Sequence, residues 1–166
     1  FSNFNIYGKA SGSGYIFFFF SQDFSEMEIK NCKISIGLLG IGCWGIISEN
    51  LLMNDLVGGI NTSGNSGSYN EISNCLMILD QANSNGIDIS GPNYADYYIR
   101  NNIILYTGSI YNNPGYGIDI GAPRTVHIYN NLISGFTNNI FTDTPDSVFI
   151  KNNLLINQYS NSSGPA

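Results

Sequence analysis

Charged side chains are scarce in this sequence. Only 11% of the 166 residues are charged, and 6 Lys and Arg stand against 12 Asp and Glu, which gives a net charge of −6. Phosphate binding requires a basic face, so this composition argues against nucleic acid as a partner and against an anionic membrane surface. Few charges beside many Asn, Ser, Gly and Tyr are typical of an extracellular, cell-surface or virion-surface protein, which is the localisation we expect.

Long apolar runs and metal-binding patterns are missing as well. The most apolar stretch, GYIFFFFSQ at 14–22, is far shorter than the roughly 20 residues of a membrane helix, so we predict a buried strand and no membrane insertion. The three cysteines form no CxxC pair, and a single histidine cannot supply a zinc site. The length predicts one domain, 1–166. Because the chain begins with Phe1, we expect a processed product or a fragment of a longer chain.

A repeated six-residue pattern organises the rest of the sequence. IRNNII at 99–104 returns as IYNNLI at 128–133 and IKNNLL at 150–155, and in altered form as IKNCKI at 29–34, ISENLL at 47–52 and ISNCLM at 72–77. The copies begin 18, 25, 27, 29 and 22 positions apart. Repeats with periods of this length are the signature of repeat architectures such as solenoids and propellers.

Apolar and polar residues alternate through each copy. The first column is isoleucine throughout and the sixth is apolar throughout: Ile29, Ile47, Ile72, Ile99, Ile128 and Ile150, then Ile34, Leu52, Met77, Ile104, Ile133 and Leu155. A second motif precedes four copies by 11 to 13 residues, as GINT, GIDIS, GIDIG and NIFT. Period-two alternation indicates short strands with one buried face, and we predict an all-β parallel solenoid of about six to seven coils.

The paired asparagines predict a tight bend between two strands. One asparagine can adopt the left-handed conformation, and the other can point inward and hydrogen-bond to the next coil. An asparagine ladder of Asn50, Asn102, Asn131 and Asn153 is expected. Cys32 and Cys75 share that inward column, about 9–10 Å apart across two coils, which is too far for a disulfide. We therefore predict free thiols there, and the redox state of Cys43 stays open.

The combined pattern V-x-I-x-N-N-x-I with G-I-D-I resembles the repeat of right-handed parallel β-helices of the pectate-lyase-like superfamily. The resemblance extends from Tyr15 to Tyr159 and implies a right-handed coil. It is weakly specific for function, because such coils occur in polysaccharide lyases, hydrolases and epimerases, in phage tailspikes and in non-catalytic surface proteins. The acidic trio, Gly-His and Arg-Ile-Lys signatures of the hydrolases are missing, as is the Pro-His that should follow the epimerase-like YGID.

Asp88 and Asp119 are the candidate catalytic or metal-binding residues. Both occupy the outward position of GIDI on adjacent coils, with Asn61 in the same column. Equivalent residues on adjacent coils lie about 5 Å apart. Two carboxylates at that distance share a proton, hold a cation such as Ca²⁺, or match the acid pair of a retaining glycosidase. The resemblance to lyases implies a nearby base, for which Arg100, Arg124 and His127 are the candidates. The alternative is that the acids are solvated surface residues and that no cofactor is required.

Two further sets of outward residues suggest binding surfaces. The first set is aromatic and consists of Tyr98, Tyr129 and Phe149, with Tyr111 and Tyr116 in loops; these residues could stack on sugar rings or pair with each other across coils. The second is the fifth column of the repeat, in which Lys33 is followed by five apolar residues: Leu51, Leu76, Ile103, Leu132 and Leu154. If the sixth column is buried, this fifth column forms an exposed apolar stripe, which marks an interface unless a loop covers it.

Three functions are therefore weighed. Neither end of the sequence resembles an amphipathic cap, so we expect missing flanking sequence or ends that pair with neighbouring subunits. The first hypothesis is a non-catalytic structural solenoid that acts by self-assembly or adhesion, with copies of itself or a larger surface assembly as partner. The second is a polysaccharide-active enzyme, lyase-like and calcium-dependent. The third is a carbohydrate-binding domain that uses Tyr98, Tyr116 and Tyr129.

Overall fold

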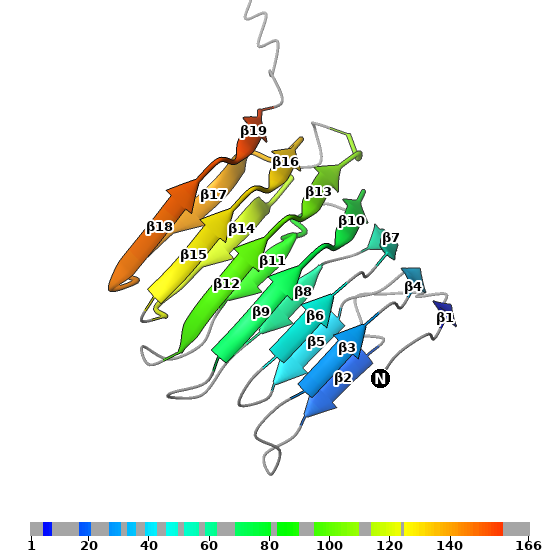
Figure 1. Ribbon diagram of the computed structural model, residues 1–166. Helices are drawn as coiled ribbons and strands as arrows, with labels where there is room; N and C mark the ends of the chain where they lie inside the picture. The colour runs from blue at the N-terminus through cyan, green and yellow to red at the C-terminus, as the bar shows by residue number, and fades with distance from the viewer. Residues whose placement is uncertain are drawn as a thin grey trace, which may run out of the picture.

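The computed structural model of the chain consists of parallel strands arranged in three stacked sheets (Figure 1). It describes residues 5–7, 17–20, 27–30, 33–35, 39–42, 46–49, 52–56, 59–62, 69–80, 83–89, 95–109, 114–123 and 125–157, with side chains at 59–60, 70–80, 83–89, 95–109, 114–123 and 125–157. Within these ranges all elements are strands. No helix in the described part is long and apolar enough to cross a membrane.

Each sheet takes every third strand of the chain. Sheet A contains β3 (Met27–Lys30), β6 (Ile46–Glu49), β9 (Tyr69–Ser73), β12 (Asp96–Arg100), β15 (Thr125–Tyr129) and β18 (Ser147–Lys151). Sheet B contains β1 (Asn5–Tyr7), β4 (Lys33–Ser35), β7 (Leu52–Leu56), β10 (Leu76–Leu79), β13 (Ile103–Tyr106), β16 (Leu132–Ser134) and β19 (Leu154–Ile156). Sheet C contains β2 (Phe17–Phe20), β5 (Leu39–Gly42), β8 (Ile60–Thr62), β11 (Ile87–Ile89), β14 (Tyr116–Ile120) and β17 (Asn138–Thr142).

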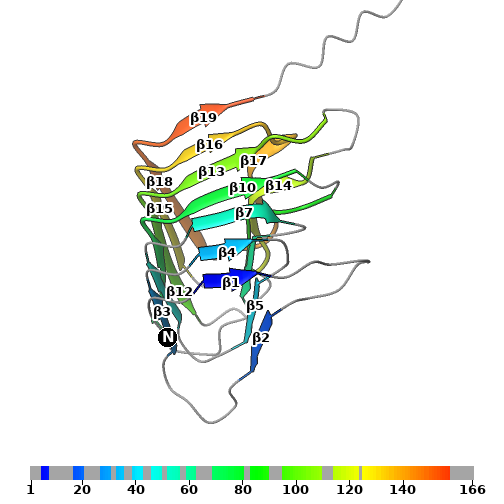
Figure 2. The same ribbon diagram turned by 90° about the vertical axis from the view of Figure 1, so that its right-hand side faces the viewer.

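Strands that neighbour each other in a sheet therefore come from successive turns of the chain. Figure 2 shows the strands of sheet B stacked one above another, from β1 to β19. All pairings among the described strands are parallel, and the GIDI strands pair residue for residue, with Ile87 opposite Ile60 and Ile118. The all-β, parallel class that the repeat predicts is what the structure contains, and this arrangement is compatible with a β-solenoid.

The core lies between the sheets and is built from the alternation within each strand. In β12 and β15 every second side chain is buried, so that Tyr97, Ile99, Val126 and Ile128 are fully enclosed. Two isoleucines in register on adjacent strands fill the same layer of the core, which is why the apolar columns recur. Cys75 is buried and is a free thiol, as predicted, while Cys32 and Cys43 lie outside the described residues.

The GIDI motifs begin with glycine because no side chain fits at that position. A Cβ atom on Gly86 would lie 2.4 Å from Cγ2 of Ile104 and 2.5 Å from the carbonyl oxygen of Gly117. Both distances are below any real contact of a Cβ atom, and one of the two neighbours is backbone. Sheets B and C therefore approach each other so closely here that only glycine fits.

The second copy of the repeat is displaced by one residue from the expected alignment. Ile47 pairs with Glu28 and Glu71, and it is Ser48 that pairs with Ile29 and Ile72. Two consecutive isoleucines, at 46 and 47, made the alternation ambiguous, and a slip of one residue exchanges the two faces of a strand. The fifth column consequently continues through Leu52 and not Leu51. Asn50 and Leu51 themselves lie outside the described residues.

The last coil exposes residues of the apolar columns. Ile150 and Leu155, which the repeat predicts as core residues, are 52% and 44% exposed. Their counterparts one coil earlier, Ile128 and Ile133, are fully buried. A core column is covered only where another coil stacks on it, and β17, β18 and β19 are the last strands of their sheets.

The two asparagines of each pair have different roles. Asn74, Asn101, Asn130 and Asn152 have φ values of 55–57°, the left-handed conformation that asparagine tolerates better than most residues. The second asparagine points inward: Nδ2 of Asn131 donates to the carbonyl of Ile99 at 3.0 Å, and its Oδ1 accepts from the backbone N–H of Asn102 at 2.9 Å. Asn153 repeats this arrangement on the following strands: its Oδ1 accepts from the backbone N–H of Asn131 and its Nδ2 donates to the carbonyl of Ile128.

We expect Asn131→Ala to lower the free energy of unfolding by about 2 kcal/mol or more, because it leaves the buried carbonyl of Ile99 and the N–H of Asn102 without their partner. The matched control is Asn130→Gly, which keeps the left-handed bend and should change stability by only a few tenths of a kcal/mol. Urea unfolding of both variants measures the difference. Equal losses of unfolding free energy in the two variants would show that the hydrogen bonds of the inward Asn131 side chain do not contribute to stability.

Candidate functional site

The outward face of sheet B is apolar on the four strands β10, β13, β16 and β19. Its two outward columns contain seven apolar side chains and one serine: Leu76, Ile103, Leu132 and Leu154, then Ile78, Leu105, Ser134 and Ile156. We call these eight residues the apolar face. Ile103, Leu154 and Ile156 are 43%, 56% and 47% exposed, and the other five side chains are half-buried. No charge lies among the eight positions, and exposed Asn101 and Asn130 border them at the bend.

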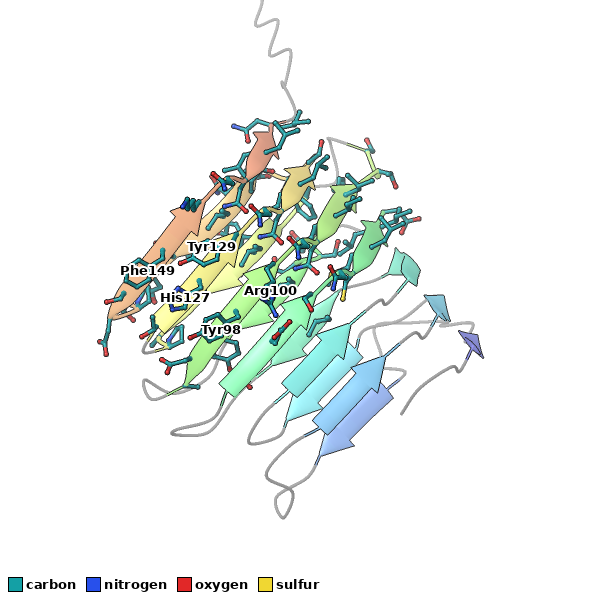
Figure 3. All side chains as sticks on the ribbon, viewed as in Figure 1. Tyr98, Arg100, His127, Tyr129 and Phe149 are labelled. Atoms are coloured by element: carbon teal, nitrogen blue, oxygen red, sulfur yellow. The ribbon has the colours of Figure 1, made fainter. Side chains whose placement is uncertain are left out.

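The outward face of sheet A carries a row of stacked rings (Figure 3). Tyr98, His127 and Phe149 are in register on β12, β15 and β18, with ring centroids 4.6 and 4.9 Å apart and planes within 8° and 9° of parallel. We call these three residues the ring row. The Tyr129 hydroxyl lies 2.8 Å from Nδ1 of His127 and links the row to the next outward column. His127 therefore lies between Tyr98 and Phe149, as the repeat predicts.

Arg100 belongs to the same face and is already paired. Its Nε and guanidinium NH2 both donate to Oε1 of Glu71, at 3.0 and 2.8 Å, across β9 and β12. An exposed pair of this kind contributes little to stability but fixes the guanidinium in place. While its guanidinium is bonded to Glu71 on sheet A, Arg100 cannot also contact a substrate on sheet C.

Asp88 and Asp119 lie in register on β11 and β14 of sheet C, with Asn61 in the same column. Nδ2 of Asn85 donates to Oδ2 of Asp119 at 3.0 Å. Burial raises the pKa of Asp88, and a hydrogen bond from Asn85 offsets part of that effect. Burial, and then the charge of Asp88, raise the pKa of Asp119. The charged form of each acid is therefore less favourable here than in a free aspartate.

The predicted catalytic residues are not brought together. Asp88 and Asp119 are on sheet C, whereas Arg100 and His127 are on sheet A, which lies on the opposite side of the stacked strands (Figure 1). Alternation points the side chains of each set away from the core and hence away from each other. Arg124 lies outside the described residues. No acid–base constellation links these four side chains.

Two carboxylates are a small part of a calcium site. Ca²⁺ takes about 6–8 oxygen ligands, and the amide NH2 of Asn85 faces Asp119 with hydrogens, which repel a cation. Among the side chains that the structure describes, no group of three or more His, Cys, Asp or Glu could hold a metal ion. A calcium site at Asp88 and Asp119 therefore stays a prediction, and no chemical step is assigned to a metal here.

A second aromatic contact was not foreseen in the sequence. Tyr116 and Phe141 stack with ring centroids 4.6 Å apart and planes 16° from parallel. A cavity of about 340 Å³ opens beside them, lined by Asn83, Asn85, Pro114, Gly115, Tyr116, Thr137 and Asn138. The sequence held one indication of this contact: the alignment of NIFT with GIDIG places Phe141 in the outward column of Asp119, on the strand next to that of Tyr116. Tyr116, which the sequence analysis placed in a loop, is the first residue of β14, and Tyr111 lies outside the described residues.

In comparisons with known proteins, no family model, no curated protein and no solved structure matches the chain.

The raised pKa values predict how stability depends on pH. Between about pH 4, where a free Asp titrates, and the raised values, the folded protein binds more protons than the unfolded chain, so this pair makes stability fall as the pH rises. Asp119→Asn should raise the melting temperature at pH 7 and weaken this dependence. Asp146→Asn, which removes an exposed acid, is the control. An Asp119→Asn variant that melts below wild type at pH 7 would contradict the expected repulsion.

Proposed function

We propose that this protein is a non-catalytic structural β-helix of an extracellular, cell or virion surface, and that it works by self-assembly or adhesion through its apolar face. In this proposal the coils are right-handed, six to seven in number, of the pectate-lyase-like type, and held at one bend by an asparagine ladder. Its partners are copies of itself or a larger surface assembly.

The apolar face is the observation that carries this proposal. Seven apolar side chains lie side by side on four neighbouring strands, and three of them are about half exposed. Burying apolar surface away from water is favourable by about 25 cal/mol of free energy per Å². Contiguous apolar surface with a polar margin is typical of protein–protein contacts.

The contrast with the other two sheets supports the same conclusion. The outward positions of β9, β12, β15 and β18 include Glu71, Asp96, Arg100, Thr125 and Lys151, and those of β11 and β14 include Asp88 and Asp119. Sheets A and C thus carry charged and polar outward residues, whereas the apolar face of sheet B carries no charged residue. The separation of Asp88 and Asp119 from Arg100 and His127 also favours a non-catalytic role.

A charge placed within the apolar face tests this function. Ile103→Lys should abolish concentration-dependent association in sedimentation velocity and remove regular oligomers or filaments in negative-stain electron microscopy, since a lysine cannot be buried unpaired. Ser147→Lys adds the same charge to an exposed outward position of sheet A and should leave association unchanged. Wild-type protein that stays monomeric at all concentrations would refute self-assembly.

Carbohydrate binding is the second candidate, and the ring row favours it. Phe149 is 49% exposed at the end of three stacked, nearly parallel rings, and Lys151 is exposed in the adjacent column of β18. An aromatic face of this kind can stack on a sugar ring, and a nearby cation can pair with a carboxylate on that sugar.

Affinity electrophoresis through gels that contain polygalacturonate, alginate or xylan tests this candidate. Wild-type protein should be retarded, and Phe149→Ala should lose most of the retardation because the outermost ring is gone. Leu154→Ala removes a similarly exposed apolar side chain from sheet B and serves as the control. Cleavage of any of these polymers, enhanced by Ca²⁺ and lost in Asp88→Ala with Asp119→Ala, would instead establish the enzymatic alternative.

A further inference from the structure

We propose that the cavity at the start of β11, β14 and β17 is a binding site for one uncharged sugar unit, either free or at the end of a chain. We call it the sheet C cavity. It lies on a different sheet from the ring row and from the apolar face. Sugar binding here therefore depends neither on self-assembly nor on the ring row.

Three short segments that occupy the same place in successive coils form the sheet C cavity. Residues 83–85 precede β11, residues 114–116 lead into β14, and residues 137–138 lead into β17. These three strands are neighbours in sheet C, and Tyr116 is in register with Asn138. The cavity volume is about 340 Å³, at the lower end of the range of about 300–1,000 Å³ for small-molecule pockets. A space of this size suits one sugar ring.

The lining of the sheet C cavity is polar and uncharged. Its side chains include three asparagines and a threonine beside the ring of a tyrosine: Asn83, Asn85, Asn138, Thr137 and Tyr116. A sugar hydroxyl both donates and accepts hydrogen bonds, and so does an asparagine amide. The C–H face of a sugar ring can pack on an aromatic ring. No charged side chain is among the lining residues, so a carboxylate or phosphate would meet no cation there.

The surroundings of the cavity also disfavour an acidic sugar. Asn85, which lines the cavity, donates through Nδ2 to Oδ2 of Asp119 at 3.0 Å, and Asp88 is in register with Asp119. A carboxylate bound in the cavity would therefore lie close to two groups of its own charge. A neutral sugar carries no such cost. The ring row differs in this respect, because Lys151 beside it suits an acidic sugar.

Hydrogen bonds within the protein hold the lining of the cavity in place. The backbone N–H of Tyr116 donates to Oδ1 of Asn85 at 2.9 Å, and Oγ1 of Thr137 donates to the carbonyl of Pro114 at 2.7 Å. A Cβ atom on Gly115 would lie 2.5 Å from Oδ1 of Asn85, so only glycine leaves room for this amide. A ligand that enters a fixed lining loses little affinity to the ordering of side chains.

A titration followed by NMR tests the sheet C cavity. Methyl glycosides of glucose, galactose, mannose and xylose are added one at a time to the ¹⁵N-labelled protein. At least one of them should produce saturable shifts of the amide signals of Asn83, Asn85, Gly115 and Asn138. Methyl glycosides of glucuronic and galacturonic acid should produce none at the same concentrations, because each carries a carboxylate.

Two variants that each remove one lining amide identify the site. Asn83→Gly keeps the left-handed backbone of this residue, whose φ is 56°, and Asn138→Ala truncates an exposed side chain at the start of β17. Each variant should weaken binding of the neutral glycoside about three- to tenfold, since each loses one hydrogen bond to the sugar. Asn130→Gly is the matched control. It changes an exposed, left-handed asparagine outside the cavity and should leave the dissociation constant unchanged.

Four results would overturn this site. They are no saturable shift with any neutral glycoside, equal affinity for the uronic acid glycosides, an affinity that Asn83→Gly and Asn138→Ala both leave unchanged, and shifts centred on Phe149 and Lys151 that vanish in Phe149→Ala. The last result would place the sugar on the ring row. Sedimentation velocity measures assembly separately, so a monomeric protein that binds in the cavity would refute self-assembly and support this site. Circular dichroism verifies that each variant is folded.

Discussion

The hydrogen bonds between parallel strands of successive coils set the spacing on which the other features depend. The backbone N–H of Ile103 donates to Cys75, that of Leu132 to Asn102 and that of Leu154 to Asn131, all at 2.8–2.9 Å. Each coil is thereby held in register with the one before it. Equivalent residues become neighbours, so isoleucine packs on isoleucine in the core, ring stacks on ring outside it, and carboxylate lies beside carboxylate.

Registered stacking makes the asparagine bend a shared structural element of the coils. A left-handed asparagine turns the chain, and the next asparagine satisfies backbone groups that the turn would leave buried without partners. Where Cys75 replaces that asparagine, Oδ1 of Asn102 still accepts the N–H of residue 75 from the following coil. The thiol of Cys75 itself donates to the carbonyl oxygen of Ser73 at 3.2 Å.

Three sheets give the molecule three outward faces of different chemistry. Sheet A combines the ring row with a paired arginine, sheet C holds two acids whose pKa values are raised by burial, and β10, β13, β16 and β19 of sheet B carry the apolar face. Side chains that lie on different faces cannot act on one substrate, which explains why a chain with acids, an arginine and a histidine assembles no reaction centre from Asp88, Asp119, Arg100 and His127.

The sequence by itself determined the strand class, the buried columns from Ile72 to Ile133, the alternation that turns Ile103 outward, and the inward position of Cys75, because each follows from period-two alternation and a repeated turn. Only the tertiary structure decided that Ser48 and not Ile47 continues the first column, since two adjacent isoleucines satisfy either parity. It also placed Arg100 and His127 away from Asp88 and Asp119. The face on which an outward residue lies depends on which of the three sheets its strand joins. Alternation within a strand shows only whether a residue points inward or outward.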